Sequence, residues 1–94
     1  MQRSYVYIMS NKHRNVLYIG VTGDLQTRVW QHKTGEGSTF TRKYNCHYLV
    51  YYEDYNDIRN AIAREKQLKE WKRSWKLNLI KSNNPTMIDL AAEW

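Results

Sequence analysis

The chain has 94 residues, which is enough for one domain with a modest core and too few for a second module. Its 15 Lys/Arg against 9 Asp/Glu give a net charge of +6, which favours acidic partners such as nucleic acid, although a basic surface that only aids solubility has the same composition. No apolar run approaches the roughly 20 residues of a membrane span, and a single cysteine, Cys46, excludes an intrachain disulfide.

We therefore expect one domain over residues 1–94, in a reducing cytoplasm. The start of the chain, Met1-Gln2-Arg3-Ser4, leads directly into a predicted strand and contains no signal-peptide core. The positive charge is uneven, because residues 1–45 hold seven Lys/Arg against two acidic residues. The first half of the chain is thus the half that would attract phosphate groups.

Two strands joined by a short turn open the chain. Ser4–Ser10 and Val16–Val21 are rich in Tyr, Val and Ile, which favour strands. The polar residues 11–15 between them are too few for a crossover connection, so we expect the two strands to pair antiparallel.

A helix follows the second strand. Thr22 or Asp24 is its predicted N-cap, and the helix should run to about Lys33. It should stop at Thr34-Gly35, where glycine permits a left-handed exit. Residues 34–46 then read as a polar loop.

The second half of the chain predicts one strand and two helices. His47–Glu53 is the most apolar segment and the third expected strand, and helices should cover about Asp57–Trp71 and Arg73–Lys81. Pro85 opens a short tail. Three strands and three helices indicate a small α/β (α+β) domain in which helices flank a largely antiparallel sheet.

Arg28 and His32 lie four residues apart on the first predicted helix and therefore share a face with Leu25 and Val29. Because this face is half apolar, we expect its polar members to be directed toward whatever the helix packs on. The alternative is an ordinary amphipathic helix whose boundary residues are Arg and His.

Glu65 is the most informative residue of the second predicted helix. The apolar residues of this helix form one stripe, namely Ile58, Ala61, Ile62 and Leu68, and Glu65 stands at its centre. A carboxylate on a core-facing line costs several kcal/mol unless it is paired or binds a metal. Two explanations stay open: an ion pair with an arginine such as Arg28, or a metal ligand, for which one carboxylate suits Mg²⁺ better than Zn²⁺.

Tyr7 and Tyr18 are either core aromatics or members of a site. Alternation along the two strands puts the apolar residues on one face, namely Val6, Ile8, Leu17 and Ile19, so the two tyrosines can share the other face. A phenol beside a metal-bound water can relay protons, and its pKa can fall near a cation. Gly20, two residues after Tyr18, would let backbone or phosphate approach closely.

Taken in order, Tyr5-Val6-Tyr7, Tyr18-Ile19-Gly20, Arg28 with His32, and Glu65 resemble the motifs of the GIY-YIG nuclease domain. The resemblance spans about Ser4 to Leu90 and is to the small stand-alone bacterial branch, related to the incision domain of nucleotide-excision repair and to homing endonucleases. It implies a three-stranded, largely antiparallel sheet flanked by helices.

The resemblance also implies roles for individual residues. Glu65 would hold one divalent metal, Mg²⁺ or Mn²⁺, and Tyr18 would be the candidate general base, with Tyr7 positioning the water or phosphate. Arg28 would stabilise charge on the scissile phosphate. The remaining implied members are His32, which would assist proton transfer, and Asn84, which would sit near the site or brace it.

Two further segments are candidate contacts to nucleic acid. Arg42 and Lys43 could touch the phosphate backbone, or belong to an ordinary solvated loop. The run Trp71–Lys76 mixes aromatic and basic residues and could stack on bases, although helical tryptophans more often seal a core edge.

The leading hypothesis is a metal-dependent endonuclease that hydrolyses DNA or another nucleic acid, in DNA repair or processing, without a membrane partner. A second is a non-catalytic nucleic-acid-binding module with the same fold, because Val21 stands where the repair branch often has a lysine near the phosphate. A third is an adaptor for a protein partner. A homodimer or a partner protein could supply specificity.

Overall fold

The computed structural model describes residues 3–94, so the expectation for Met1 and Gln2 lies outside the described residues. Its three strands form one antiparallel sheet in the order β2-β1-β3. The strands are β1 (Ser4–Ser10), β2 (Leu17–Thr22) and β3 (Tyr48–Tyr55). The central position of β1 brings both of its neighbours to the strand that carries Tyr7.

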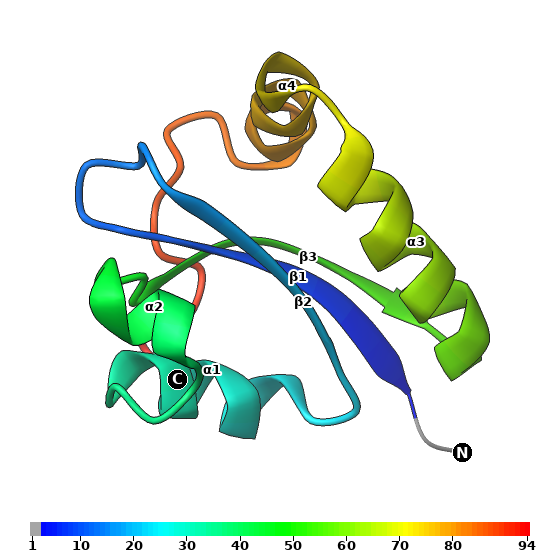
Figure 1. Cartoon of the computed structure of the whole chain (residues 1–94), viewed down its shortest axis with the longest axis horizontal. Coiled ribbons are helices and arrows are strands. Elements are labelled where there is room, and N and C mark those ends of the chain that lie inside the picture. The colour runs from blue at the N-terminus through cyan, green and yellow to red at the C-terminus, as the bar shows by residue number, and fades with distance from the viewer. Residues whose placement is uncertain (1–2) are drawn as a thin grey trace.

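Helices cover both faces of this sheet. They are α1 (Leu25–Lys33), α2 (Thr39–Lys43), α3 (Ile58–Glu70) and α4 (Arg73–Asn83). Figure 1 shows α1 and α2 on one side of the strands and α3 and α4 on the other. The predicted α+β architecture is therefore confirmed, with one helix more than the sequence indicated.

The additional helix is α2, which lies inside the predicted polar loop of residues 34–46. It forms because Ser38 caps it, with Ser38 Oγ accepting a hydrogen bond from the backbone N–H of Thr41. A helix of five residues carries too few turns to show an apolar period, so the sequence pattern could not reveal it. The expected loop placement of Arg42 and Lys43 is corrected accordingly, since both lie in α2.

The other boundaries were predicted to within two residues. The cap of α1 is Asp24, whose side chain accepts a hydrogen bond from the Thr27 backbone, and Gly35 leaves the helix with a φ of 84°. β3 extends two residues beyond the predicted Glu53 because its pairing with β1 continues to Ser4 and Tyr55.

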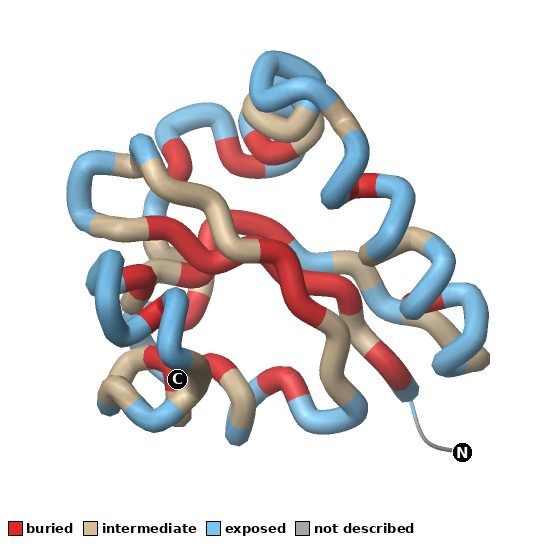
Figure 2. Tube along the Cα trace, viewed as in Figure 1, coloured by how far each residue is buried: buried red, intermediate tan, exposed pale blue. Residues whose placement is uncertain are grey.

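Two apolar clusters hold the layers together, and Figure 2 shows the buried positions concentrated along the strands. Val6, Ile8 and Ile19 pack against α3 and α4, while Tyr7, Leu25 and Val29 belong to the cluster on the α1 side. Strand alternation therefore separated the two faces correctly, with Tyr7 and Tyr18 on the same side.

The predicted apolar stripe of α3 is wrong in one respect. Ile58 and Ile62 are 45% and 37% exposed, while Ala61 and Leu68 are fully buried. The buried side of α3 is turned toward Arg64, whose guanidinium binds the Glu53 carboxylate on β3 with an N–O distance of 3.0 Å. Arg64 and Glu65 flank the buried Ala61 and Leu68 on this side, with side chains that are 22% and 16% exposed.

Within residues 3–94, none of the helices combines the length and apolar character that a bilayer crossing requires. Cys46 is a buried free thiol that packs in the cluster around Tyr7 and Leu49.

Candidate active site

Tyr7 is the centre of the candidate site. It lies on β1 directly opposite Gly20 of β2, and its side chain is almost fully buried. A Cβ atom added at Gly20 would come within 2.4 Å of Tyr7 Oη, so the phenol occupies the space that any other residue would fill. The sequence predicted that Gly20 permits a close approach, and the group that approaches is the Tyr7 phenol.

His32 lies against this phenol. It is fully buried on α1, and its Nε2 is 2.8 Å from Tyr7 Oη. Its other ring nitrogen, Nδ1, is 2.9 Å from Thr41 Oγ1 on α2. The sequence predicted that the polar residues of α1 point inward, and this is confirmed for His32, which is buried together with Leu25 and Val29.

Arg28 stands one turn before His32 on the same side of α1. Its Nε donates to Tyr7 Oη at 3.4 Å, and its Nη1 donates to Gln31 Oε1 at 3.0 Å. A guanidinium has five N–H donors, so these two contacts fix its position and leave donors for a ligand. The Arg28 guanidinium is therefore held in place beside the buried Tyr7 hydroxyl group.

Tyr18 completes the group from β2. Its ring centroid is 6.4 Å from that of Tyr7 and 5.4 Å from that of His32. It also stacks at 5.8 Å against Phe40, which is 42% exposed on α2. Tyr18 itself is half-buried, so it is the tyrosine of the pair that reaches the surface.

The protonation of the site follows from its burial. Burial raises the pKa of Tyr7 to about 12, although the hydrogen bond from Arg28 opposes this shift. Burial, and then the charge of Arg28, lower the pKa of His32 to about 4. A cation can lower the pKa of a phenol, but at Tyr7 desolvation outweighs Arg28 and the pKa rises. Near neutral pH the site thus holds a neutral phenol and a neutral imidazole.

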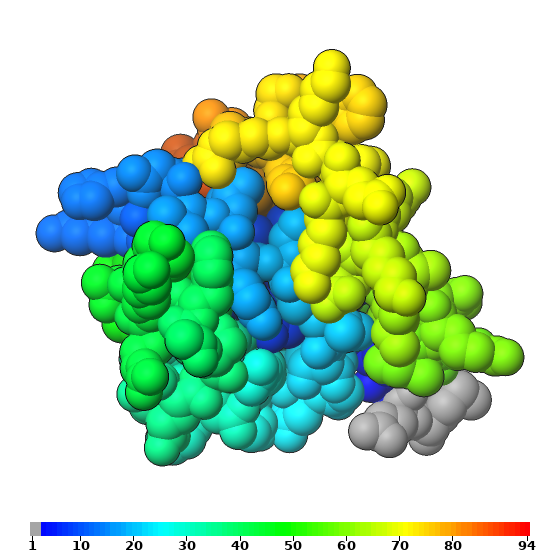
Figure 3. All heavy atoms as spheres, in the orientation of Figure 1, coloured from blue at the N-terminus to red at the C-terminus, as the bar shows by residue number. Residues whose placement is uncertain are grey.

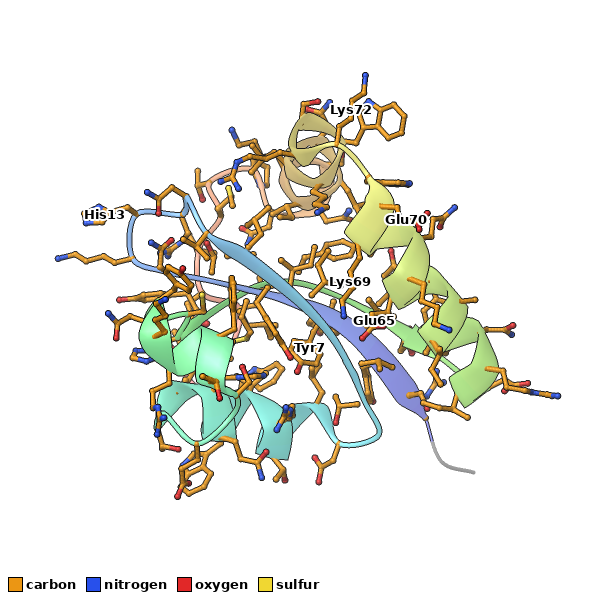
Figure 4. All side chains as sticks on the ribbon, in the orientation of Figure 1. Tyr7, His13, Glu65, Lys69, Glu70 and Lys72 are labelled. Carbon is orange, nitrogen blue, oxygen red and sulfur yellow. The ribbon has the colours of Figure 1, made fainter. Side chains whose placement is uncertain are left out.

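Glu65 approaches from the opposite side of the sheet. α3 packs against β1 and β2, and Figure 4 shows Glu65 and Lys69 on the α3 side of the strands and Tyr7 on the α1 side. The Glu65 side chain is 16% exposed, and its Oε2 is 3.5 Å from Nζ of the half-exposed Lys69. The alternative of an ion pair between Glu65 and Arg28 is not realised, because Arg28 binds Tyr7 and Gln31.

Tyr7 and Glu65 are nevertheless electrostatically connected, since the negative charge of Glu65 contributes to raising the pKa of Tyr7. β2 is the edge strand of the sheet on the side of β1 away from β3, and it has no side chain at Gly20, opposite Tyr7. Figure 3 views this edge, with β2 visible between the α1–α2 side and the α3–α4 side.

The donor set at Glu65 fits Mg²⁺ or Mn²⁺. Within the described part of the chain, no group of three or more His, Cys, Asp or Glu side chains could hold a metal ion. Mg²⁺ commonly binds one or two carboxylates, keeps several waters and takes further oxygens from phosphate, and Mn²⁺ shares its preference for oxygen ligands. Glu65 is a single carboxylate that touches solvent, which is the kind of ligand that such an ion takes from a protein.

Asn84 lies apart from these groups. It is buried after α4, where its amide donates to the carbonyls of Val50 and Ile88 at 3.0 and 2.9 Å and accepts from the Ile88 backbone at 3.1 Å. All of these bonds hold the C-terminal tail against β3, and none of them reaches Tyr7, Arg28 or His32, so the structure does not bring Asn84 together with the other predicted site residues.

The predicted nucleic-acid contacts lie on the surface. Arg42 and Lys43 are exposed in the last turn of α2. Trp71 packs against the core, with its ring 6.0 Å from that of Trp75, which is 50% exposed. Trp71 therefore seals a core edge, and only Trp75 is available for contact.

Two residues of the site were not identified from the sequence. Thr41 is fully buried and binds His32, and a Cβ atom at Gly37 would come within 2.0 Å of His32 Nδ1. A threonine and a glycine in a polar segment are common residues there, so neither forms a motif or an apolar period that would indicate a role in the site. Their distance of only nine and five residues from His32 is the one hint that the sequence offers.

Comparisons with known proteins place these residues in a wider context. The family model described as "GIY-YIG catalytic domain" matches residues 3–78. UPF0213 protein CPE1444 of Clostridium perfringens is 38% identical over 81 residues, covering 86% of each chain. UPF0213 protein SH2523 of Staphylococcus haemolyticus is 35% identical over 80 residues, which cover 85% of this chain and 96% of that relative.

A solved structure is also similar. The solution NMR structure of the UPF0213 protein BH0048 from Bacillus halodurans superposes with a TM-score of 0.57 and 28% sequence identity. The match covers 87% of this chain and 86% of the other. The segment matched by the family model contains every predicted site residue except Asn84.

Proposed function

Because the chain belongs to the GIY-YIG nuclease family, we propose that it is a metal-dependent endonuclease that hydrolyses phosphodiester bonds in nucleic acid. DNA is the proposed substrate. The observation that carries this proposal is the convergence of Tyr7, Arg28 and His32 in direct contact, with Tyr18 packed on them. Glu65 lies on the other side of the strands, on α3, and its charge contributes to the raised pKa of Tyr7.

Arg28 has the chemistry to bind the scissile phosphate. Phosphodiester cleavage increases negative charge on the phosphoryl oxygens, and a preorganised guanidinium stabilises that charge. Arginine can bind two oxygens at once, which a lysine cannot do. The hydrogen bonds to Tyr7 and Gln31 hold Arg28 in position before a substrate arrives.

Tyr18 would handle the proton of the attacking water, and Tyr7 would position the groups around it. Both phenols lie beside Arg28, and Tyr7 Oη is 2.8 Å from His32 Nε2. Tyr18 reaches the surface and is the candidate for direct contact with the water, as the family resemblance implies. General acid–base catalysis of this kind contributes about 10²- to 10⁴-fold to a rate.

Glu65 would hold the divalent ion, which when bound supplies a positive charge near the phosphate and makes the attacking water more acidic. The contact of Glu65 with Lys69 is long and half-exposed, so this ion pair contributes little and can be replaced.

A second candidate function is a nucleic-acid-binding module without turnover. It is favoured by Val21, which packs against the core on β2 and puts no cation where the repair branch has a lysine. Salt-sensitive binding without cleavage would select this alternative.

The decisive experiment is nicking of supercoiled plasmid with Mg²⁺ or Mn²⁺ and with EDTA. We expect metal-dependent nicking that Glu65→Gln and Arg28→Lys each reduce by at least about 10²-fold, the size of effect measured when one charge-stabilising group is removed. Glu70→Gln is the matched control, because Glu70 is exposed on the same helix and should leave nicking unchanged.

If the wild-type protein cleaves no duplex, nicked, branched or single-stranded substrate with any divalent ion, the proposal is wrong. Equal loss in Glu65→Gln and Glu70→Gln would show that the helix charge, and not a specific ligand, is responsible. Circular dichroism of each variant checks that the fold is retained.

A further inference from the structure

A continuous chain of hydrogen bonds leads from Tyr7 through His32 to the cap of α2. Tyr7 Oη lies 2.8 Å from His32 Nε2, and His32 Nδ1 lies 2.9 Å from Thr41 Oγ1. Thr41 Oγ1 in turn donates to the Ser38 carbonyl at 3.3 Å and lies 2.9 Å from Ser38 Oγ. Tyr7, His32 and Thr41 are all at most 1% exposed, so protein groups and not bulk water decide where the protons lie.

A neutral imidazole carries its proton on one nitrogen only, so two arrangements are conceivable. In the first, Nδ1–H donates to Thr41 and the bare Nε2 accepts from Tyr7. In the second, Nε2–H donates to Tyr7 and the bare Nδ1 accepts from Thr41. The partners of the two hydroxyl groups distinguish between them.

The first arrangement satisfies every group. Thr41 accepts from His32 and donates to the Ser38 carbonyl, while Ser38 Oγ accepts from the Thr41 N–H at 3.1 Å and is free to donate to Thr41 Oγ1. Tyr7 accepts from Arg28 and donates to His32. All the contacts are used, and each hydroxyl proton has an acceptor.

The second arrangement makes one bond fewer and leaves one donor unpaired. Thr41 would lose its bond to the Ser38 carbonyl in order to donate to Nδ1, although that carbonyl still accepts from the Arg42 backbone N–H. Tyr7 would accept from both His32 and Arg28, and within residues 3–94 its own buried proton would have no other acceptor. A buried donor without a partner is strongly disfavoured, because it loses its bonds to water and gains none in the protein.

We propose that Thr41, held by the Ser38 cap of α2, is a positioning residue that fixes the Nδ1–H tautomer of His32 and so keeps Nε2 as the acceptor for the Tyr7 proton. Gly37 makes this contact possible, because any Cβ atom at this position would lie 2.0 Å from His32 Nδ1. Thr41 of the short helix α2 thereby acts on the site through His32.

The consequence for catalysis rests on the proposed nuclease function. As the oxygen of the attacking water bonds to phosphorus and the P–O bond to the leaving group breaks, the water proton passes to Tyr18, the candidate base that reaches the surface, and the leaving oxygen takes a proton from solvent. Tyr7 keeps its own proton, which it donates in a hydrogen bond to His32 Nε2, so its oxygen is free to accept from Arg28 and hold the guanidinium in place for the phosphate. In the second tautomer Nε2–H would compete for the Tyr7 oxygen, and Arg28 would lose part of its anchor.

The tautomer can be read directly by ¹⁵N-detected NMR of the folded protein labelled at histidine, near neutral pH. Its three histidines, His13, His32 and His47, are assigned by single substitution of the other two. We expect the His32 proton on Nδ1 in the wild-type protein. A proton on Nε2 would overturn the proposal without any variant or any substrate.

Thr41→Val and Thr41→Ser test the role of the hydroxyl group. Valine has nearly the same shape and no acceptor, so we expect a mixture of tautomers, a less well anchored Arg28 and a kcat lower by about 10- to 100-fold, with KM little changed. This is less than the loss of about 10²- to 10³-fold expected when a charge-stabilising group is removed outright. Thr41→Ser keeps the hydroxyl and should restore both the Nδ1–H signal and kcat. An unaltered tautomer in folded Thr41→Val would overturn the proposal.

The NMR readout separates this proposal from the nuclease function. If the wild-type protein shows Nδ1–H and Thr41→Val loses it, the positioning role of Thr41 stands even where no cleavage is found. If cleavage is found and falls in Thr41→Val while the tautomer is unchanged, the nuclease function stands and the role assigned to Thr41 is wrong. Should Thr41→Val not fold, the wild-type spectrum and Thr41→Ser still decide.

Discussion

Gly20 shows how one residue determines whether the site can be assembled. It lies opposite Tyr7 in the sheet, and the absence of a side chain leaves the space that the phenol fills. With any other residue at position 20, the Tyr7 ring would have to leave its hydrogen bond to His32. The glycine is required by packing and not by a left-handed backbone, since its φ is not positive.

We expect Gly20→Ala to destabilise the protein by about 1–3 kcal/mol, because a methyl group is forced into a filled site. It should also abolish any activity that depends on Tyr7. Urea denaturation and plasmid nicking measure the two effects. Gly35→Ala is the matched control: its Cβ would have no neighbour closer than 3.9 Å, but its φ of 84° costs about 1 kcal/mol. It should therefore lower stability and leave the site intact.

The buried imidazole of His32 should make stability depend on pH. Its pKa falls from the usual 6.5 to about 4 in the folded protein, first because of burial and then because of Arg28. Below pH 6.5 the unfolded chain takes up the proton before the folded one does. Stability is therefore fully present above pH 6.5 and is lost progressively down to about pH 4, by an amount of about 3 kcal/mol.

Urea unfolding of the wild type and of His32→Asn between pH 7 and pH 4 checks this expectation. The variant lacks the titration, so the difference between the two stabilities should shrink as the pH falls. Carboxylates such as Glu53 and Asp89, whose pKa values are lowered despite burial by partners that favour the charged form, contribute equally to both proteins. Parallel curves would contradict the assignment of the low pKa to His32.

At the scale of elements, two short segments outside the obvious pattern hold the molecule in shape. The helix α2 presents Thr41 to His32, and the segment after α4 is fastened by Asn84 to β3 and to Ile88. Neither segment has an apolar period, and both depend on side-chain hydrogen bonds to backbone groups.

Asn84→Ala should cost about 1–3 kcal/mol, because it leaves the buried carbonyl of Val50 without this donor and removes two part-buried bonds to the Ile88 backbone. Asn83→Ala is the matched control, since Asn83 is exposed and makes one bond to the carbonyl of Leu79. Below its melting temperature, Asn84→Ala should keep the wild-type kcat. A fall in kcat in the folded variant would show that Asn84 belongs to the catalytic site after all.

At the scale of the whole molecule, the charge of +6 should govern binding to nucleic acid. Each phosphate contact releases counterions, so the affinity should fall linearly on a log–log plot against salt concentration, by about 0.9 in slope per contact with duplex DNA. Arg42→Ala and Lys43→Ala should each reduce the slope by about one unit if these exposed side chains bind phosphates.

Fluorescence anisotropy with a labelled duplex between 50 and 200 mM NaCl, roughly the range over which such affinities change most, measures the slope. Arg59→Ala is the matched control, because Arg59 is exposed but already paired with Asp57, and it should leave the slope unchanged. An equal change in all three variants would mean that only net charge matters.

The sequence by itself determined the secondary structure of the longer elements and the division of the sheet into two faces. Strand alternation placed Tyr7 and Tyr18 together, and the four-residue spacing of Arg28 and His32 directed them to one side of α1. These predictions succeeded because the period at which apolar residues repeat can be read from a short stretch of the sequence. The family resemblance added Glu65 to the same set of residues.

The tertiary structure alone decided how these residues meet. It showed that Tyr7 fills the space at Gly20, that Thr41 and Gly37 hold His32, and that Asn84 braces the tail. It also turned α3 so that Ile58 and Ile62 face outward. Such contacts join residues on different elements. They depend on strand register and helix packing, which produce no periodic pattern in the sequence.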